Sequence, residues 1–308
     1  MGLNDPVQET QSWSAKAFAP AHLTGFFEIH DEHKNPYRKG SRGAGLNLDM
    51  GVTADVTIHQ DEGAIEVYVN GIADEAPTVH RAVRGLLGDA YPARVEIRLS
   101  SDLPPSQGFG LSGAGALATG FALAELVKFP VKNAVWEAHK AEVESRTGLG
   151  DVPAQFVGGA EVRVTPGPMP MGVTERFAGI ETRRWKIVCC VLDEPLTTSS
   201  VLGDPARRQR VNDAAVGLVE ALKDDPTLST YMRLSRRFAE AAGFITPPLA
   251  DALDTADRHG LATQTMLGNA LHCLVAPEAA DAAAEGLQGH GRVWVCGIAT
   301  RGAHVVRE

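Results

Sequence analysis

Glycines surround a single serine in the middle of this chain, between a pair of prolines and a long apolar run. Gly108, Gly110 and Gly113 flank Ser112 and remove the side chains that would keep a ligand away from the backbone. Residues 114–128 have the helix formers and the continuous apolarity of a buried helix, so we expect unpaired backbone N–H groups at its start. Such a helix start binds anions, most commonly phosphate.

The alternative interpretation of this loop is a tight glycine turn between a strand and a helix. The loop is not a Walker A motif, because no Lys-Ser/Thr pair follows its glycines. It also lacks a clean dinucleotide-binding G-x-G-x-x-G at the start of a strand–turn–helix unit. The loop by itself leaves both interpretations open, so other parts of the chain must decide.

Acidic residues follow the loop closely in sequence. His139 and Glu142 are three positions apart on a predicted helix at 131–146, so they share one face. Asp151 stands in a glycine-bracketed segment, 147–159, that we expect to be a loop held by rigid elements. The chain thus gathers an anion loop, a helix-borne Glu and a loop-borne Asp. The alternatives are boundary residues of a surface helix and a turn Asp that caps its own backbone.

The elements that must position these residues form two groups. Before the glycine loop, alternation and turn residues predict mainly strands with one helix, an order that suits an α+β domain and not a regularly alternating parallel sheet. A strand at Ala160–Thr165, which carries Arg163, follows the Asp151 segment. The predicted strands of the first group lie near 14–29, 52–59, 64–70 and 94–100, and its early helix lies at 77–87.

The Pro-rich stretch 166–172 is the best linker candidate, and a second α+β domain is predicted after it. We expect an N-terminal domain at 13–178 and a C-terminal domain at 179–308. The second group comprises strands near 184–193, 263–276, 292–299 and 302–306, with helices near 205–223, 229–242, 248–259 and 277–287.

Composition excludes several function classes. With 308 residues, 44% of them hydrophobic, the chain can bury a core large enough for two domains. It has neither a run of roughly 20 apolar residues nor the pattern of a secretory leader, so we expect a soluble cytoplasmic protein without a membrane partner. A net charge of −9 without a basic stripe argues against nucleic acid as a partner.

The cysteines and one histidine pair do not predict a metal site. Cys189, Cys190, Cys273 and Cys296 lie in apolar, strand-like runs without C-x-x-C spacing, as buried thiols of a reducing compartment do. The cluster at 30–33, His-Asp-Glu-His, could be drawn as a metal site. A loop of such mixed charge is more often simply solvated.

Several segments of the chain resemble, in the same order, the motifs of the GHMP kinases, the family of galactokinase, homoserine kinase and mevalonate kinase. Leu111 stands where the family usually has the first serine of its Pro-x-x-x-Gly-Leu-Gly-Ser-Ser-Ala motif, and the last segment lacks the usual glycines. The matching segments are Ala17–Phe27, the loop Pro104–Gly113, the Asp151 segment closed by Gly158 and Gly159, and the run 263–276.

Within the family, the chain is most similar to the archaeal pantoate kinase branch. The shared words are Ala-Pro-x-His-Leu-Thr-Gly-Phe-Phe, Gly-Ser-Arg-Gly-Ala-Gly, Gly-Leu-Gly-Asp-Val and Met-Leu-Gly-Asn. On this resemblance the missing serine and glycines are traits of the branch and need not signal an inactive enzyme. The resemblance implies ATP-dependent phosphorylation of the primary hydroxyl of pantoate to 4-phosphopantoate, in coenzyme A biosynthesis.

The resemblance also implies site roles. Ser112 and Glu142 would hold Mg²⁺, for which hard oxygen ligands are suited. Asp151 would accept or orient the proton of the substrate hydroxyl, and His22 stands where several members carry a lysine that assists this Asp. ATP would bind at Pro105, Gly108, Gly110, Ser112, Gly113 and Ala114, and the substrate-side residues would be His139, Arg163, Thr198 and Arg42.

Structural roles remain open for several of these residues. Arg163 can grip a carboxylate in bidentate fashion, or it can pair with a structural acid. Arg42 can meet phosphate, carboxylate or only solvent, and His22 can be a satisfied structural histidine. Thr198 has the hydroxyl neighbours Thr197, Ser199 and Ser200, any of which could be its true counterpart.

The resemblance implies an α+β fold with an N-terminal domain like the second domain of ribosomal protein S5 and a ferredoxin-like C-terminal domain, with the active site between them. It also makes a homodimer plausible. The alternatives for function are another small-molecule GHMP kinase, for mevalonate, homoserine or shikimate, and a nucleotide-binding relative without turnover. The joint presence of Ser112, Glu142 and Asp151 argues against the latter.

Overall fold

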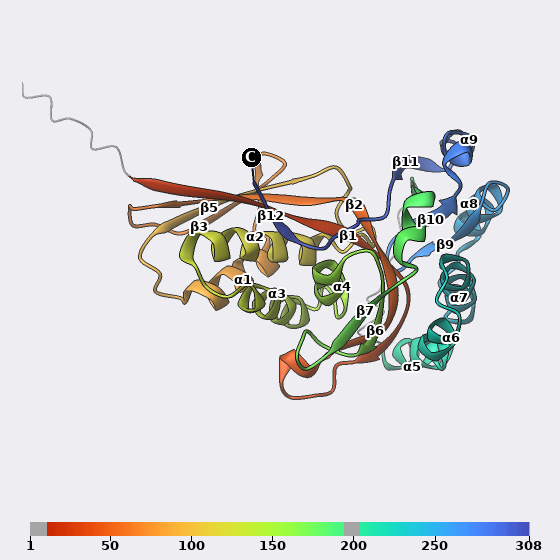
Figure 1. The fold of residues 1–308 in the computed structure, drawn as a ribbon, viewed down its shortest axis with the longest axis horizontal. Coiled ribbons are helices and arrows are strands. Elements are labelled where there is room, and N and C mark those ends of the chain that lie inside the picture. Colours follow the sequence, from red (N-terminus) through yellow and green to blue (C-terminus); the bar gives the residue numbers. More distant parts are fainter. Residues whose placement is uncertain (1–10, 194–203, 308) are drawn as a thin grey trace, which may run out of the picture.

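The computed structural model describes residues 11–193 and 204–307, which form two β-sheets with helices packed against them (Figure 1). The first sheet has eight strands in the order β12-β1-β2-β5-β3-β4, with β6 paired to β2 and β7 paired to β6. Its strands are β1 (Ser12–His30), β2 (Gly40–His59), β3 (Ile65–Val69), β4 (Ile72–Ala73), β5 (Arg94–Ser101), β6 (Ala160–Thr165), β7 (Val173–Phe177) and β12 (His304–Val306).

The long antiparallel pair of β1 and β2 is bent in its middle. Register shifts interrupt the pair between Pro20 and His22 and again between Thr24 and Phe26, as β-bulges do. Over residues 14–29, where the sequence allows two short strands or one strand with a bend, the structure forms one bent strand. Beyond the bend, β2 exchanges neighbours: its second half pairs with β5, and its first half pairs with β6. His22 therefore lies where the sheet divides.

The glycine cluster 40–45 is part of strand β2, where it lets neighbouring groups come close. Gly45 faces His22 across the strand pair, and a Cβ atom at Gly45 would overlap the His22 Nε2 atom. The absence of a side chain here leaves room for a buried histidine ring between the strands.

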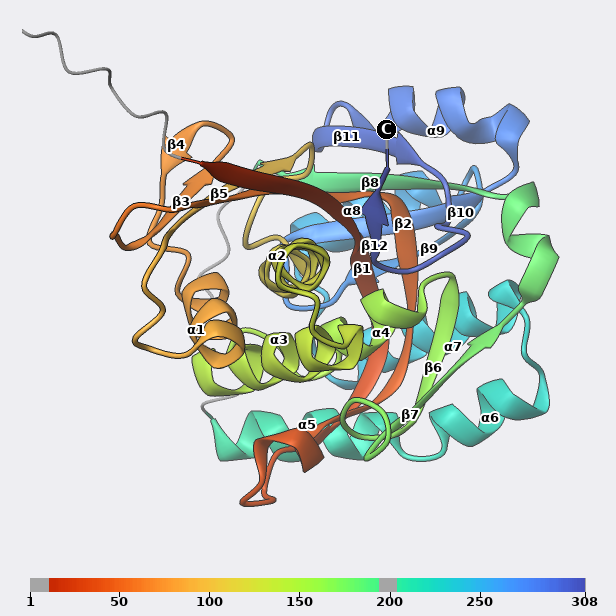
Figure 2. The same ribbon diagram turned by 60° about the vertical axis from the view of Figure 1, so that its left-hand side comes forward.

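Three helices, α1 (Pro77–Leu87), α2 (Leu111–Val127) and α3 (Val131–Ser145), cover one face of the first sheet (Figure 2). The central helix α2 is buried along residues 113–124, as its continuous apolarity predicts. Because α2 is enclosed by the sheet and by α3, its glycine-rich start is held rigidly. A fourth helix, α4 (Asp151–Val157), follows and leads into β6.

The second sheet has the strand order β11-β8-β10-β9, with all neighbours antiparallel. In chain order this is the β-α-β-β-α-β arrangement of ferredoxin-like domains. Its strands are β8 (Lys186–Leu192), β9 (Leu261–Thr265), β10 (Ala270–Val275) and β11 (Gly291–Cys296). Its helices are α5 (Pro205–Ala215), α6 (Leu218–Asp224), α7 (Leu228–Ala241), α8 (Pro247–Ala256) and α9 (Ala280–Leu287).

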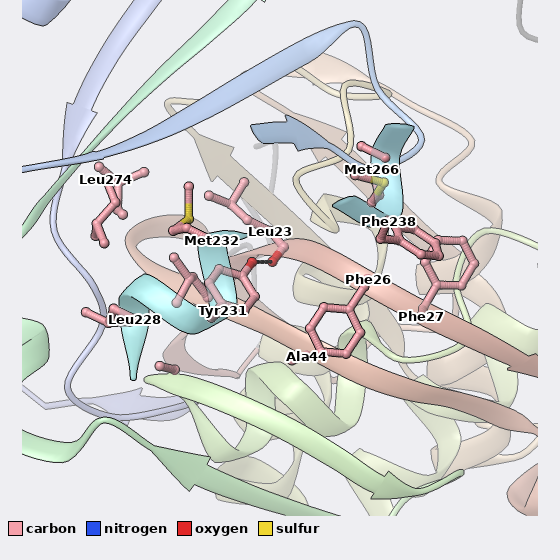
Figure 3. Packing of buried hydrophobic residues seen from close by; sticks show 14 of the residues in the cluster. Leu23, Phe26, Phe27, Ala44, Leu228, Tyr231, Met232, Phe238, Met266 and Leu274 are labelled. Carbon is pink, nitrogen blue, oxygen red and sulfur yellow. Dashed lines mark hydrogen bonds between the residues drawn. The ribbon is translucent and has the colours of Figure 1, made fainter. Parts of the chain in front are cut away.

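One hydrophobic core connects β1 of the first sheet with helix α7 (Figure 3). Tyr231 and Phe238 of α7 pack against the aromatic rings of Phe26 and Phe27. The Tyr231 hydroxyl also donates a hydrogen bond to the carbonyl oxygen of Leu23, at 3.3 Å. This packing holds the second half of β1 against helix α7.

The α+β class is confirmed, and most predicted elements are present. Three expectations were wrong in detail. The linker candidate 166–172 connects β6 and β7, which are antiparallel partners. The run 263–276 contains two strands, β9 and β10, with a turn between them, and the expected Asp151 loop is the first turn of α4.

The structure also describes the cysteines and the apolarity of the helices. The four cysteines are buried and free, as predicted. In the part of the chain that the structure describes, no helix has the length and apolarity that crossing a membrane requires.

Candidate active site

A buried histidine joins two acidic residues from distant parts of the chain. His22 Nδ1 lies 2.7 Å from Asp151 Oδ1, and His22 Nε2 lies 3.0 Å from Glu161 Oε1. The three side chains come from β1, from the first residue of α4 and from β6, and the bend in β1 brings them together. The glycine-bracketed Asp151 thus does not merely cap its own backbone, because its carboxylate has a partner from the other end of the domain.

The two carboxylates beside His22 favour its protonated form. Complete burial of His22 disfavours the charged form, but the hydrogen bonds and the negative charges of Asp151 and Glu161 outweigh burial and raise its pKa. In the protonated form, each ring nitrogen can donate a hydrogen bond to one carboxylate. The site therefore favours a positive charge on His22, beside Asp151.

Glu142 lies under the start of helix α2. Ser112 Oγ donates to Glu142 Oε1 at 2.6 Å, and Thr147 Oγ1 donates to the same oxygen at 2.8 Å. The other oxygen, Oε2, is buried and has no hydrogen-bond partner among the described residues. Burial first, and then the charge of Asp151, raise the pKa of Glu142 to about 7.

These atoms fit a hard divalent cation. Glu142 Oε2 lies 2.1 Å from the position that a Cβ atom of Gly148 would take, and the buried Gln155 Oε1 atom is likewise without a partner in the described chain. Together with the Ser112 hydroxyl they form an all-oxygen donor set, which suits Mg²⁺. An unpaired buried carboxylate oxygen is costly by itself, and a cation would remove that cost.

The glycine loop lies directly beside this cluster. Gly108 and Gly110 have φ angles of 81° and 61°, which side-chain-bearing residues seldom adopt. Gly110 is the N-cap of α2, and its carbonyl oxygen accepts a hydrogen bond of 2.8 Å from Gln155 Nε2. The loop is also tied to β1, because the backbone N–H of His22 donates to the carbonyl oxygen of Phe109 at 2.9 Å.

The C-terminal run packs onto the same loop. The turn between β9 and β10 is so close that a Cβ at Gly268 would overlap the carbonyl group of Gln107, and a Cβ at Gly108 would lie 2.5 Å from the carbonyl oxygen of Met266. The structure therefore brings together the second and fourth segments of the resemblance. Of the other predicted ATP residues, Pro105 is exposed, Gly113 faces Glu142, and the Ala114 side chain is buried in the core.

Arg163 has a buried guanidinium group with one unused edge. Its Nη1 atom pairs with Glu161, whereas Nε and Nη2 are buried and have no partner within the described residues. A Cβ at Gly150 would lie 2.6 Å from Arg163 Nε, and a Cβ at Gly43 would lie 3.1 Å from Nη2. Two glycines thus border the edge that matches a carboxylate in geometry.

The remaining predicted residues lie elsewhere or are engaged otherwise. His139 is buried, and its Nε2–H donates to the carbonyl oxygen of Lys39 at 3.0 Å; burial lowers its pKa to about 4, so it is neutral. Arg42 pairs with Glu28 at 3.1 Å and with Glu220 at 2.5 Å, and the structure does not bring it to Asp151. Thr198 and its hydroxyl neighbours Thr197, Ser199 and Ser200 lie outside the described residues.

Sequence reasoning missed Glu161 and Gln155. A signal for Glu161 was present, because residues two apart on a strand share a face, and Glu161 precedes Arg163 by two. Gln155 shares helix α4 with Asp151, but the segment was expected to be a loop, and a loop has no defined face.

Comparisons with known proteins agree with this geometry. Residues 77–159 match the family model of the GHMP kinases N terminal domain. The chain is 34% identical over 275 residues to the pantoate kinase of Thermococcus kodakarensis, which covers 87% of this chain and 90% of that protein. It is 31% identical over 257 residues to the pantoate kinase of Methanocaldococcus jannaschii, with 83% and 91% covered.

Solved structures of other proteins have a similar fold. A phosphotransferase related to the CoA biosynthesis pathway superposes with a TM-score of 0.85 and 30% identity over 96% of this chain and 99% of that one. Mevalonate-3-kinase of Thermoplasma acidophilum shares the fold, with a TM-score of 0.68 and 15% identity over 96% and 99% of the two chains. The GHMP kinase fold expected from the sequence is thus confirmed. The chain belongs to the GHMP kinase family, in which it groups with the archaeal pantoate kinases.

Proposed function

We propose that this protein is a pantoate kinase, which transfers the γ-phosphoryl group of ATP to the primary hydroxyl of pantoate in coenzyme A biosynthesis. The relatives named pantoate kinase and the CoA-related phosphotransferase support the substrate. The observation that carries the chemistry is the buried pair of His22 and Asp151, which lies beside the start of a glycine-bordered helix. This arrangement places a carboxylate that can face the substrate hydroxyl next to a candidate anion site.

In this proposal Asp151 handles the substrate proton. Its Oδ1 atom is held by His22 at 2.7 Å, which leaves Oδ2 for the pantoate hydroxyl. As the hydroxyl oxygen forms its bond to the γ-phosphorus, its proton passes to Asp151 and ADP departs. The contact with His22 holds the Asp151 carboxylate in place to receive this proton.

Arg163 would bind the pantoate carboxylate. Its unused Nε and Nη2 atoms can donate two parallel hydrogen bonds, and the residues that border them most closely, Gly150 and Gly43, have no side chains. Glu161 neutralises the guanidinium from the other side. Such a clamp fixes the distance between the substrate hydroxyl and Asp151, and positioning supplies much of the rate in phosphoryl transfer.

The glycine loop would bind ATP, and Ser112 and Glu142 would hold Mg²⁺. No side chain caps the start of α2 at Gly110 within the described residues, and Glu142 Oε2 has no other partner there. When bound, the metal neutralises charge on the nucleotide phosphates. The all-oxygen donor set supports Mg²⁺ over zinc.

The proposal is tested by coupled ADP release with ATP, Mg²⁺ and each of pantoate, mevalonate, homoserine and shikimate. We expect turnover with pantoate alone and a loss of roughly 10²–10⁴-fold in kcat for Asp151→Ala. Turnover with another acceptor would discard pantoate and keep the family. Binding of ATP without any turnover would favour the nucleotide-binding relative.

The domain boundary, the cellular compartment and the oligomeric state belong to the same proposal. A division into domains at 178/179 is supported by the two sheets, although β12 returns to pair with β1. Four free, buried cysteines support a reducing compartment such as the cytoplasm. A homodimer is testable by light scattering after size-exclusion chromatography. The net charge of −9 argues against nucleic acid as a partner.

A further inference from the structure

We propose that Glu161 is a positioning residue, which holds the histidine beside the catalytic Asp and the arginine of the carboxylate clamp in one fixed arrangement. This inference rests on the proposed function and deepens it. None of the motifs that identify the family includes Glu161, and its role follows from contacts alone.

A single oxygen of Glu161 contacts both cationic side chains. Oε1 lies 3.0 Å from His22 Nε2 and also pairs with Arg163 Nη1. All three side chains are at most 2% exposed. Asp151, His22, Glu161 and Arg163 therefore form a row in which acidic and basic groups alternate, and it is buried except at Asp151, whose side chain is 19% exposed.

Glu161 is important because its negative charge lies between the basic side chains of His22 and Arg163. Without its charge, two buried cations would face each other, since Arg163 Nη1 lies 3.4 Å from His22 Nε2. Like charges at that distance in a dry site repel strongly, and a buried charge without a counter-charge is costly. Either the histidine would lose its second proton or the arginine would turn away. The first change removes the positive charge beside Asp151, and the second disrupts the clamp.

Titratable groups face His22 from four elements. Asp151 approaches from α4 and Glu161 and Arg163 approach from β6, whereas Glu142 of α3 and His272 of β10 interact with it electrostatically. Of these, the carboxylates within hydrogen-bonding distance of the His22 ring are Asp151 and Glu161. Glu161 is the one that no catalytic step employs, so its removal tests positioning separately from proton transfer.

Glu161→Gln is the isosteric test. We expect kcat with pantoate to fall roughly 10²-fold and the KM for pantoate to rise roughly tenfold, while the KM for ATP stays within twofold, because the glycine loop does not contact Glu161. Glu161→Asp keeps the charge and should recover part of both losses. If Glu161→Gln does not fold, Glu161→Asp carries the test through the same split between the pantoate and ATP constants.

The chain offers a matched control in Glu96. This carboxylate on β5 also serves a histidine and arginines: His59 at 4.0 Å, Arg98 at 2.6 Å and Arg94 at 3.7 Å. It lies at the opposite end of β2 from the site. Glu96→Gln should therefore leave all kinetic constants within twofold, which excludes a general effect of removing a strand carboxylate.

A readout without substrate separates this inference from the proposed function. In ¹⁵N-histidine-labelled protein, the His22 signals, assigned by their loss in His22→Gln, should show two protonated nitrogens at pH 7.5 and change in Glu161→Gln. Unchanged His22 signals, or kinetics in which pantoate and ATP constants shift together, would overturn the positioning role. A wild-type protein inactive on pantoate would remove the proposed function, and the labelled-histidine comparison would still decide about Glu161.

Discussion

His22 Nδ1 lies 2.7 Å from Asp151 Oδ1, although 129 positions separate the two residues in the chain. The contact requires a bent strand to meet the first turn of a short helix. It raises the pKa of a buried histidine and gives one carboxylate oxygen a hydrogen-bond partner. Most of the predictions below depend on this arrangement and on the glycines around it.

Replacement of His22 should impair chemistry more than substrate binding. In His22→Asn the cation beside Asp151 is lost, so we expect kcat with pantoate to fall roughly 10²-fold with little change in the KM for ATP. His22→Lys restores a positive charge and should recover part of the loss. His290→Asn, a histidine near the second sheet, is the control. Equal kcat values for His22→Asn and wild type would refute a role for the cation.

Mg²⁺ affinity should weaken as the pH falls below about 7. The pKa of Glu142 is raised to about 7, so its carboxyl is increasingly protonated below that pH, and a protonated carboxyl is a poor ligand. We expect the apparent Kd for Mg²⁺, measured by calorimetry with a non-hydrolysable ATP analogue, to rise about tenfold from pH 8 to pH 6. Glu142→Gln has no carboxyl group at this position, so its apparent Kd for Mg²⁺ should lack this tenfold change between pH 8 and pH 6.

The same carboxyl should affect the stability of the metal-free protein. Its pKa is higher in the folded than in the unfolded chain, so the folded state binds more protons between the two values. The contribution is present at low pH and is lost as the pH rises through about 7. Chemical unfolding of wild type and Glu142→Gln without metal at pH 5.5 and 8 should show a larger decrease for wild type. A parallel decrease in both proteins would contradict this assignment.

A methyl group at Gly150 should block the carboxylate clamp. A Cβ there would lie 2.6 Å from Arg163 Nε and would also overlap Ser41 Oγ. The φ angle of Gly150 is −135°, outside the left-handed region, so the backbone can accept alanine. We expect Gly150→Ala to raise the KM for pantoate roughly tenfold and to leave the KM for ATP within twofold. Gly289→Ala, at an open position, is the control. Equal rises in both constants would place the clamp elsewhere.

A methyl group at Gly268 should instead disturb nucleotide binding. A Cβ at this position would overlap the Gln107 carbonyl group and push the β9–β10 turn away from the glycine loop. We expect Gly268→Ala to raise the KM for ATP roughly tenfold, with the KM for pantoate changed less than threefold. Gly289→Ala again serves for comparison. The reverse pattern would show that the turn belongs to the acceptor side.

Local patterns predicted elements whose forming interactions are themselves local. The helix Pro77–Leu87 and the strand Ala160–Thr165 have the bounds that Pro at N1 and strand alternation predict. Helix α4 was missed because it has only seven residues, with a proline inside and glycines on both sides. The turn between β9 and β10 was missed because Leu267, not glycine, has the left-handed φ of 65° there.

The sequence by itself determined the α+β class and gave the glycine-rich start of α2 as a candidate anion site. It also singled out Ser112, Glu142 and Asp151 as candidates, since residue type and spacing carry these. The tertiary structure decided which side chains contact one another. It paired His22 with Asp151, engaged Arg42 with Glu28 and Glu220, tied His139 to a backbone carbonyl, and introduced Glu161 between His22 and Arg163. Such pairings depend on strand register and on the bend in β1, which bring together residues far apart in the chain, and no local pattern encodes them.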